Sequence, residues 1–128
     1  MERAIEKRVR ERRQALEEAR AVAKCLASKL GRVAVVLYGS FARGDFNEWS
    51  DIDLLVVCSR ELPKNPIERL SLVEECLSLS PRIELVILSV DELRRQLAKG
   101  NPLVVEAVER GVEVINTLGE PLPRLCVR

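Results

Sequence analysis

Two aspartates separated by one residue are the clearest chemical feature of the chain. Asp51 and Asp53 stand at the start of an apolar run, residues 52–57, that is typical of a β-strand. Side chains two residues apart on a strand point to the same face, so the two carboxylates share one face. Neighbouring ionised carboxylates repel each other unless a cation neutralises them, and Mg²⁺ prefers carboxylate and phosphate oxygens. The pair therefore predicts a divalent-metal site.

A third carboxylate, Glu84, lies within a later apolar run, residues 83–88. A helix over about residues 66–79 is long enough to be a crossover, which makes this later strand parallel to the strand of the aspartates. Glu84 then joins the aspartates at one end of the sheet. Two Mg²⁺ ions about 3.5–4 Å apart can stabilise the attacking and leaving oxygens of an in-line phosphoryl displacement. Taken alone, Glu84 would fit equally well as an edge residue that reaches solvent.

Gly39 and Ser40 supply the features that a phosphate group would need. Because glycine has no side chain, a phosphate can approach the backbone at Gly39, and the Ser40 hydroxyl can donate a hydrogen bond to it. Arg43 follows one short turn later and is placed either to pair with phosphate oxygens or only to neutralise Asp45 or Glu48. A glycine and a serine after a strand also form ordinary turns. Gly39 and Ser40 therefore indicate a phosphate-binding site only in combination with the carboxylates.

The composition excludes several other kinds of catalytic site. The chain has 128 residues and no histidine, which removes Ser/His/Asp and Cys/His catalysis and every metal site that needs an imidazole. Lys and Arg total 21 against 20 Asp and Glu, so the formal charge of +1 neither requires nor excludes a nucleic-acid partner. If the chain is an enzyme, its carboxylates must carry the chemistry.

The elements that position these residues follow from the periodicity of the apolar side chains. Apolar residues at helical spacing predict a long first helix, and runs rich in β-branched residues predict about four strands. We expect an α+β (α/β) fold, a small mixed sheet flanked by helices, in a single domain over residues 1–128. The domain is predicted to consist of a helix over 1–30, a core over 32–116 and an irregular tail over 117–128. Within the core we expect strands at 33–38, 52–57, 83–88 and 112–115. Later helices of the core are expected at 91–99 and from there up to residue 110.

The first thirty residues hold nine Lys and Arg and five Glu, so the predicted first helix is basic. This face could contact RNA, DNA or an acidic protein. We favour the alternative that it is a solvated face, in which Glu and Arg neighbours pair with each other.

The four cysteines are Cys25, Cys58, Cys76 and Cys126. Their wide spacing, without a CxxC pair, argues against a zinc ribbon or a thioredoxin-like redox site. We expect buried thiols, and disulfides if the source is a hyperthermophile, which the low Asn and Gln content permits. The chain has neither a signal-peptide-like start nor a long apolar stretch, so we expect a cytoplasmic protein without a membrane partner.

The string GSFARGDFNEWSDIDLLVV, residues 39–57, resembles the active-site pattern of the DNA polymerase β-type nucleotidyltransferase superfamily. More narrowly, it is similar to the minimal nucleotidyltransferases, including those that pair with a HEPN-domain protein as the MNT/HEPN toxin–antitoxin system. The resemblance spans about residues 33–115 in element order. It implies a fold like the polymerase β palm.

Carried over by position, the resemblance implies that Gly39 and Ser40 hold a nucleoside triphosphate and that Asp51 and Asp53 ligate Mg²⁺. Glu84 would be the third carboxylate, which helps to bind the catalytic metal and activates the acceptor hydroxyl. Many relatives have aspartate at this position, and glutamate is one methylene longer.

The resemblance implies a Mg²⁺-dependent transfer of a nucleoside monophosphate, AMP from ATP, to a hydroxyl of a partner protein. A chain of this length has no acceptor-binding domain of its own, which favours a HEPN-type toxin as the acceptor and an antitoxin role for the chain. One alternative is a non-catalytic antitoxin or complex subunit that acts by contact and at most binds nucleotide. A weaker alternative is transfer onto RNA held by Arg8, Arg12 and Arg13. A homodimer through the last helices also stays open.

Overall fold

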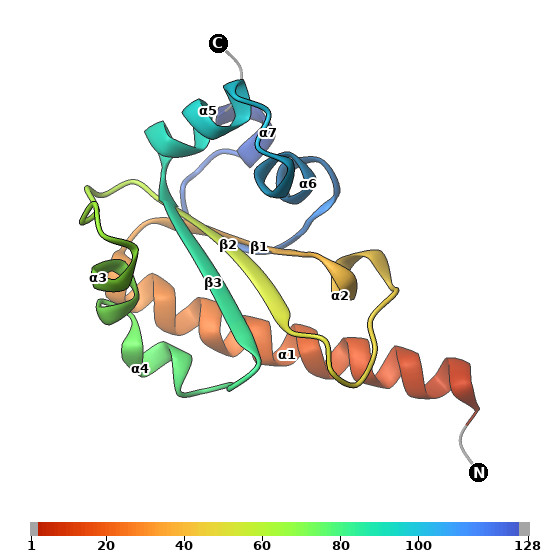
Figure 1. Cartoon of the computed structure of the whole chain (residues 1–128). Helices are drawn as coiled ribbons and strands as arrows, with labels where there is room; N and C mark the ends of the chain where they lie inside the picture. Colours follow the sequence, from red (N-terminus) through yellow and green to blue (C-terminus); the bar gives the residue numbers. More distant parts are fainter. Residues whose placement is uncertain (1–2, 126–128) are drawn as a thin grey trace.

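The computed structural model describes residues 3–125 as helices around one four-stranded sheet with the order β3-β2-β1-β4 (Figure 1). The predicted mixed α+β fold with a long N-terminal helix is confirmed. Along the chain the elements are α1 (Ala4–Leu30), β1 (Val33–Tyr38), α2 (Ser40–Arg43), β2 (Ile52–Cys58), α3 (Pro66–Ser71), α4 (Glu74–Leu77), β3 (Ile83–Ser89), α5 (Val90–Ala98), α6 (Pro102–Arg110), β4 (Val112–Asn116) and α7 (Leu122–Leu125).

The register of the sheet brings the ends of three strands together. β1 and β2 are antiparallel, and Tyr38 at the end of β1 lies opposite Asp53 near the start of β2. β2 and β3 are parallel, and Asp53 lies beside Glu84. β4 pairs antiparallel with the other side of β1, as an edge strand. The predicted convergence of strand ends is therefore confirmed.

Helices cover both faces of the sheet and divide the core into two clusters (Figure 1). On one face, α1 and α4 pack against alternate strand residues such as Val35, Leu54 and Val56. On the other face, α5 and α6 cover Val36, Leu55 and their neighbours. Because side chains alternate along a strand, Asp53 shares this second face with Leu55. The carboxylates therefore lie on the α5 and α6 side of the sheet.

The long first helix begins beyond the sheet and ends against it. Its C-terminal half is buried through Val22 and Leu26, and Gly31 ends the helix with a positive φ of 83°. Its first turns project past the sheet in Figure 1, and Ile5 and Val9 are exposed there. The predicted apolar face is thus a core face from Ala15 onward and is exposed in the first turns.

The crossover between β2 and β3 differs from the prediction of one helix over about 66–79. It consists of two short helices, α3 and α4, with a break at Leu72 and Val73. Val73 is β-branched, leaves helical geometry at φ −123° and ψ 19°, and is fully buried. The break lets Val73 and Cys76 both reach the core cluster beneath α1. Packing of these side chains overrides the helical periodicity.

The tail also differs from the prediction of an irregular segment over 117–128. It contains a one-turn helix, α7, and Leu122 within it is 3% exposed. Leu122 packs into the cluster of the α5 and α6 face, which gives the turn an anchor. Residues 126–128 lie outside the described residues.

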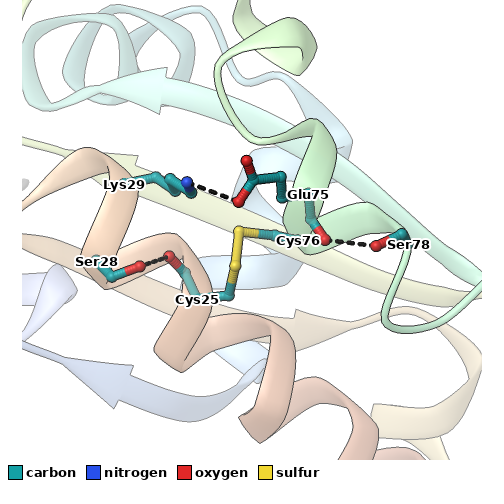
Figure 2. The surroundings of a disulfide bond; sticks show 6 residues. All are labelled: Cys25, Ser28, Lys29, Glu75, Cys76 and Ser78. Carbon is teal, nitrogen blue, oxygen red and sulfur yellow. Dashed lines mark hydrogen bonds and ion pairs between the residues drawn. A yellow bond between two sulfur atoms is a disulfide. The ribbon is translucent and has the colours of Figure 1, made fainter.

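A disulfide between Cys25 and Cys76 joins α1 to α4, with their Cα atoms 5.5 Å apart (Figure 2). The expectation of thiols is wrong for these two residues, because helix packing places them side by side although they are 51 residues apart in sequence. An ion pair between Lys29 and Glu75, 2.8 Å long, lies beside the bond. Cys58 is a buried free thiol, as expected. Cys126 lies outside the described residues.

Within residues 3–125, the helices are either too short or too polar to cross a membrane.

Candidate active site

Asp53 is the centre of the carboxylate group. Its side chain is partly buried on β2 and lies beside Glu84, its register partner on β3. Burial, followed by the charges of Glu84 and Asp51, raises its pKa from 3.8 to about 6, while the charge of Arg43 acts in the opposite direction. A carboxylate that is costly to ionise in this way is stabilised by any cation that binds beside it.

Gly39 touches Asp53 so closely that no other residue fits there. Its backbone adopts a φ of 78°, and a Cβ built at this position would collide with the Oδ2 atom of Asp53. The glycine predicted to admit a phosphate therefore lies against the central carboxylate. Any side chain at position 39 would displace Asp53 or strain the turn.

Ser40 begins α2 directly after Gly39 and is partly exposed. Its carbonyl accepts a hydrogen bond of 2.8 Å from the Gly44 amide. Among the hydrogen bonds of residues 3–125, none involves the Ser40 hydroxyl, so this group is free to bind an incoming ligand.

Arg43 at the end of α2 is held by two carboxylates. Its Nε lies 3.2 Å from Asp45 Oδ2, and its Nη1 lies 2.5 Å from Glu106 Oε1. These hydrogen bonds, first to Glu106 and then to Asp45, raise the pKa of Arg43 above its usual range. The predicted pairing with Asp45 is confirmed, but the second partner is Glu106 of α6 instead of Glu48. Binding of a phosphate would require Arg43 to release at least one of them.

The three predicted carboxylates are not equally placed. Asp53 and Glu84 are neighbours on adjacent strands, whereas Asp51 precedes β2; Asp51 and Glu84 are both exposed, and Asp53 is partly buried. In the part of the chain that the structure describes, no group of three Asp, Glu or Cys side chains is arranged to hold a metal ion. The donor chemistry nevertheless fits Mg²⁺, since the side chains offer carboxylate oxygens and a nearby cation would stabilise the ionised form of the partly buried Asp53.

Tyr38 and Glu106 belong to the same site, and the sequence analysis did not identify them. Tyr38 is 8% exposed, and burial, with the charges of Asp53, Glu84 and Glu106, raises its pKa to about 12. Tyr38 directly precedes Gly39 and lies opposite Asp53, so the predicted antiparallel pairing of the two strands could have identified it. The sequence could not have predicted that Glu106 lies in the site, because its position depends on how α6 packs against the sheet.

An apolar pocket of about 390 Å³ opens beside the site. Tyr38 and Glu84 line one part of it, and leucines of α3, α4, β3 and α6 line the rest, namely Leu70, Leu77, Leu85 and Leu103. A larger hollow of about 600 Å³ lies at the other end of β2 and β3, around Ser59 and Ser89, and touches none of the predicted site residues.

The chain matches the family model described as a nucleotidyltransferase domain over residues 19–114. It is also 49% identical over 37 residues to a protein of Methanocaldococcus jannaschii described as a candidate protein adenylyltransferase. That match spans 29% of this chain and 24% of the relative's length.

Solved structures share the fold. A candidate nucleotidyltransferase from Sulfolobus solfataricus superposes with a TM-score of 0.62 at 23% identity, over 83% of this chain and 84% of its own. A toxin–antitoxin structure with AMP-PNP gives 0.58 at 19% identity, over 85% and 80%. A variant of the MntA–HpeT toxin–antitoxin gives 0.54 at 17% identity, over 82% and 77%. At these identities the similarity concerns the fold alone.

Proposed function

Because the chain belongs to the nucleotidyltransferase domain family, whose model covers residues 19–114, we propose that it transfers AMP from ATP to a hydroxyl group of a partner protein. The observation that carries the proposal is the contact of Asp53 with Glu84 on one side and with Gly39 on the other. The proposal is supported because this carboxylate pair, which a bound cation would stabilise, lies beside the glycine that we propose to contact the phosphate.

Each residue of the site has a distinct part in the proposed reaction. Asp51, Asp53 and Glu84 would hold Mg²⁺, which when bound neutralises phosphate charge and polarises the α-phosphate. Gly39, whose missing side chain leaves room for the Asp53 carboxylate, would bind the triphosphate through its backbone, and the Ser40 hydroxyl would donate a hydrogen bond to one of the triphosphate oxygens. The acceptor oxygen forms a bond to the α-phosphorus while the bond to the bridging oxygen breaks, and pyrophosphate leaves. Glu84 accepts the proton of the acceptor hydroxyl.

Arg43 is proposed as a further phosphate ligand. Its guanidinium lies on the same loop as Ser40 and now pairs with Asp45 and Glu106. A triphosphate offers stronger acceptors than a single carboxylate, so its arrival would compete with Glu106 for the Nη1 donor.

The proposed acceptor is a HEPN-type toxin, for which the chain would act as antitoxin. Support comes from the fold similarity to toxin–antitoxin proteins and from the short match to the M. jannaschii relative. The apolar pocket beside Glu84 would receive the part of the partner that carries the hydroxyl.

The test is transfer of label from α-labelled ATP to the helical protein encoded by the neighbouring gene, in the presence of Mg²⁺. We expect label on that protein with the wild type and none with Asp53→Ala or without Mg²⁺. Equal labelling by the wild type and Asp53→Ala, or no labelling by either, would overturn the proposal.

A second candidate function is a contact-only antitoxin that does not catalyse transfer. Two observations favour it: glutamate at position 84, and the absence of a ready-made metal group among residues 3–125. The double variant Asp51→Ala with Asp53→Ala separates the candidates. If it still neutralises the toxin as well as the wild type does, contact suffices and catalysis is not required.

Transfer onto RNA has less support than either protein-directed function. Two of the arginines that motivated it, Arg8 and Arg12, bond to the chain's own backbone. A salt-dependent RNA affinity that is lost in Arg13→Ala would revive this candidate.

A further inference from the structure

Two arginines of α1 hold the segment that follows Gly39. One Nη2 atom of Arg8 donates to the carbonyls of Gly44, at 2.6 Å, and of Phe46, at 3.0 Å. The Nε of Arg12 donates to the carbonyl of Phe41 at 3.1 Å. The partners are 29 to 38 residues away in sequence, so these are tertiary contacts that tie α1 to residues 39–46.

Residues 39–46 need such contacts because their local structure is weak. α2 is a single turn of four residues, and one turn is too short to be stable by itself. Glycines stand at both ends of it, at 39 and 44, and both have a positive φ. A turn flanked by glycines has many accessible conformations, so contacts with other parts of the chain must stabilise the one that is observed.

The arginines also meet the only aromatic stack of the described residues. Phe41 and Phe46, both nearly fully buried, stack with ring centroids 4.5 Å apart. The guanidinium of Arg8 lies 4.5 Å from the Phe46 centroid, on the same ring whose backbone carbonyl it bonds. Arg8 thus contacts both the ring and the backbone carbonyl of Phe46.

We propose that Arg8 and Arg12 are positioning residues, which hold residues 39–46 in the nucleotide-binding conformation before the nucleotide arrives. The inference rests on the proposed function, since it assumes that Gly39 and Ser40 receive the triphosphate. Both arginines would act through the backbone carbonyls that they bond, those of Phe41, Gly44 and Phe46. Without them, nucleotide binding must also order the segment, and the apparent affinity falls.

The matched control is Arg13, the neighbour of Arg12 on the same helix. Arg13 is exposed, and within residues 3–125 no hydrogen bond or ion pair involves it. Arg13→Ala removes the same charge and the same kind of side chain from α1 without releasing a carbonyl of residues 39–46.

Two measurements on the full chain with its disulfide intact test the proposal. Calorimetric titration with Mg²⁺ and a non-hydrolysable ATP analogue should give a Kd at least about tenfold higher for Arg8→Ala with Arg12→Ala than for the wild type. Arg13→Ala should stay within about twofold. Hydrogen exchange without nucleotide should show faster exchange at the amides of Ala42, Arg43 and Gly44, which close the turn, in the double alanine variant only.

The outcomes separate this inference from the proposed function. If the wild type does not bind the analogue, the proposed function fails, whereas if wild type and double variant bind equally, only the positioning role fails. Equal exchange at residues 42–44 in all variants would also overturn it. Should the double alanine variant not fold, Arg8→Lys with Arg12→Lys serves, because lysine keeps the charge but cannot reproduce the guanidinium geometry, so a raised Kd is again expected.

Discussion

Replacing Asp53 by asparagine is expected to stabilise the protein while removing its proposed activity. Asparagine has nearly the same shape as aspartate but no charge, and its amide can donate to Glu84. In the wild type, burial and the neighbouring carboxylates raise the pKa of Asp53 from 3.8 to about 6. The ionised side chain therefore costs free energy in the folded state that asparagine does not.

The size of the effect follows from this difference in pKa. One pH unit corresponds to about 1.4 kcal/mol, so the change from 3.8 to about 6 amounts to roughly 3 kcal/mol once Asp53 is ionised in both states. Well below pH 3.8 the side chain is protonated in both states and the penalty is absent, whereas near pH 4 about half of the unfolded chains are ionised and only a small part of the penalty applies. As pH rises through the window between 3.8 and about 6, the folded state holds a proton that the unfolded state has lost. Above that window the whole penalty applies.

Urea denaturation of wild type and Asp53→Asn checks the prediction, with both proteins oxidised at Cys25 and Cys76. We expect the variant to be more stable by about 2–3 kcal/mol near pH 7.5 and by less than about 1 kcal/mol near pH 4. Comparing the two proteins at each pH cancels the titration of the carboxylates that lie away from Asp53. Added Mg²⁺ should stabilise the wild type near pH 7.5 and leave the variant unchanged, if the carboxylates bind the cation.

An equal or lower stability of the variant near pH 7.5 would refute the reasoning, because it would mean that the carboxylate is not penalised by its surroundings. A gain of the same size at both pH values would also refute it. In that case the gain would come from packing of the amide and not from the charge.

Three further predictions concern other parts of the molecule. Gly39→Ala should lower the free energy of unfolding by about 1 kcal/mol or more and abolish analogue binding, because its Cβ collides with Asp53; unchanged calorimetric binding would contradict this. Reducing the bond between Cys25 and Cys76, which closes a 51-residue separation, should cost about 4 kcal/mol, seen as a lower urea midpoint with reductant than without. Tyr38 is the only tyrosine, so ultraviolet absorbance follows its ionisation, which should be roughly one tenth complete near pH 11. Its raised pKa should also lower the stability of the fold as pH rises from 10 to about 12. An ionisation midpoint near pH 10 would contradict the burial of Tyr38.

The parts of the fold that could be predicted depend on local patterns and on general rules of topology. The convergence of Asp53 and Glu84 required only an antiparallel pair, a crossover and the period of a strand. Gly31 ended the first helix where the pattern changed. These signals lie within a few residues of the feature that they predict.

The parts that could not be predicted depend on how separate elements pack. The bond between Cys25 and Cys76 exists because α1 lies across α4, and no spacing in the sequence encodes that contact. Glu106 reaches Arg43 from 63 residues away for the same reason. Composition could not divide the arginines of α1 into those that bond to residues 39–46, such as Arg8, and those that do not, such as Arg13.

The disulfide would keep the chain in one covalent piece after a proteolytic cut between its two cysteines. The segment between β2 and α3, residues 59–65, is largely exposed and contains Pro63, and it separates Cys25 from Cys76 in sequence. A protease that cuts there would leave two fragments that remain one covalent molecule. One fragment would carry Asp53 and the other Glu84, so the two halves of the carboxylate pair would stay tethered across the cut. Electrophoresis would then detect the cut only after reduction.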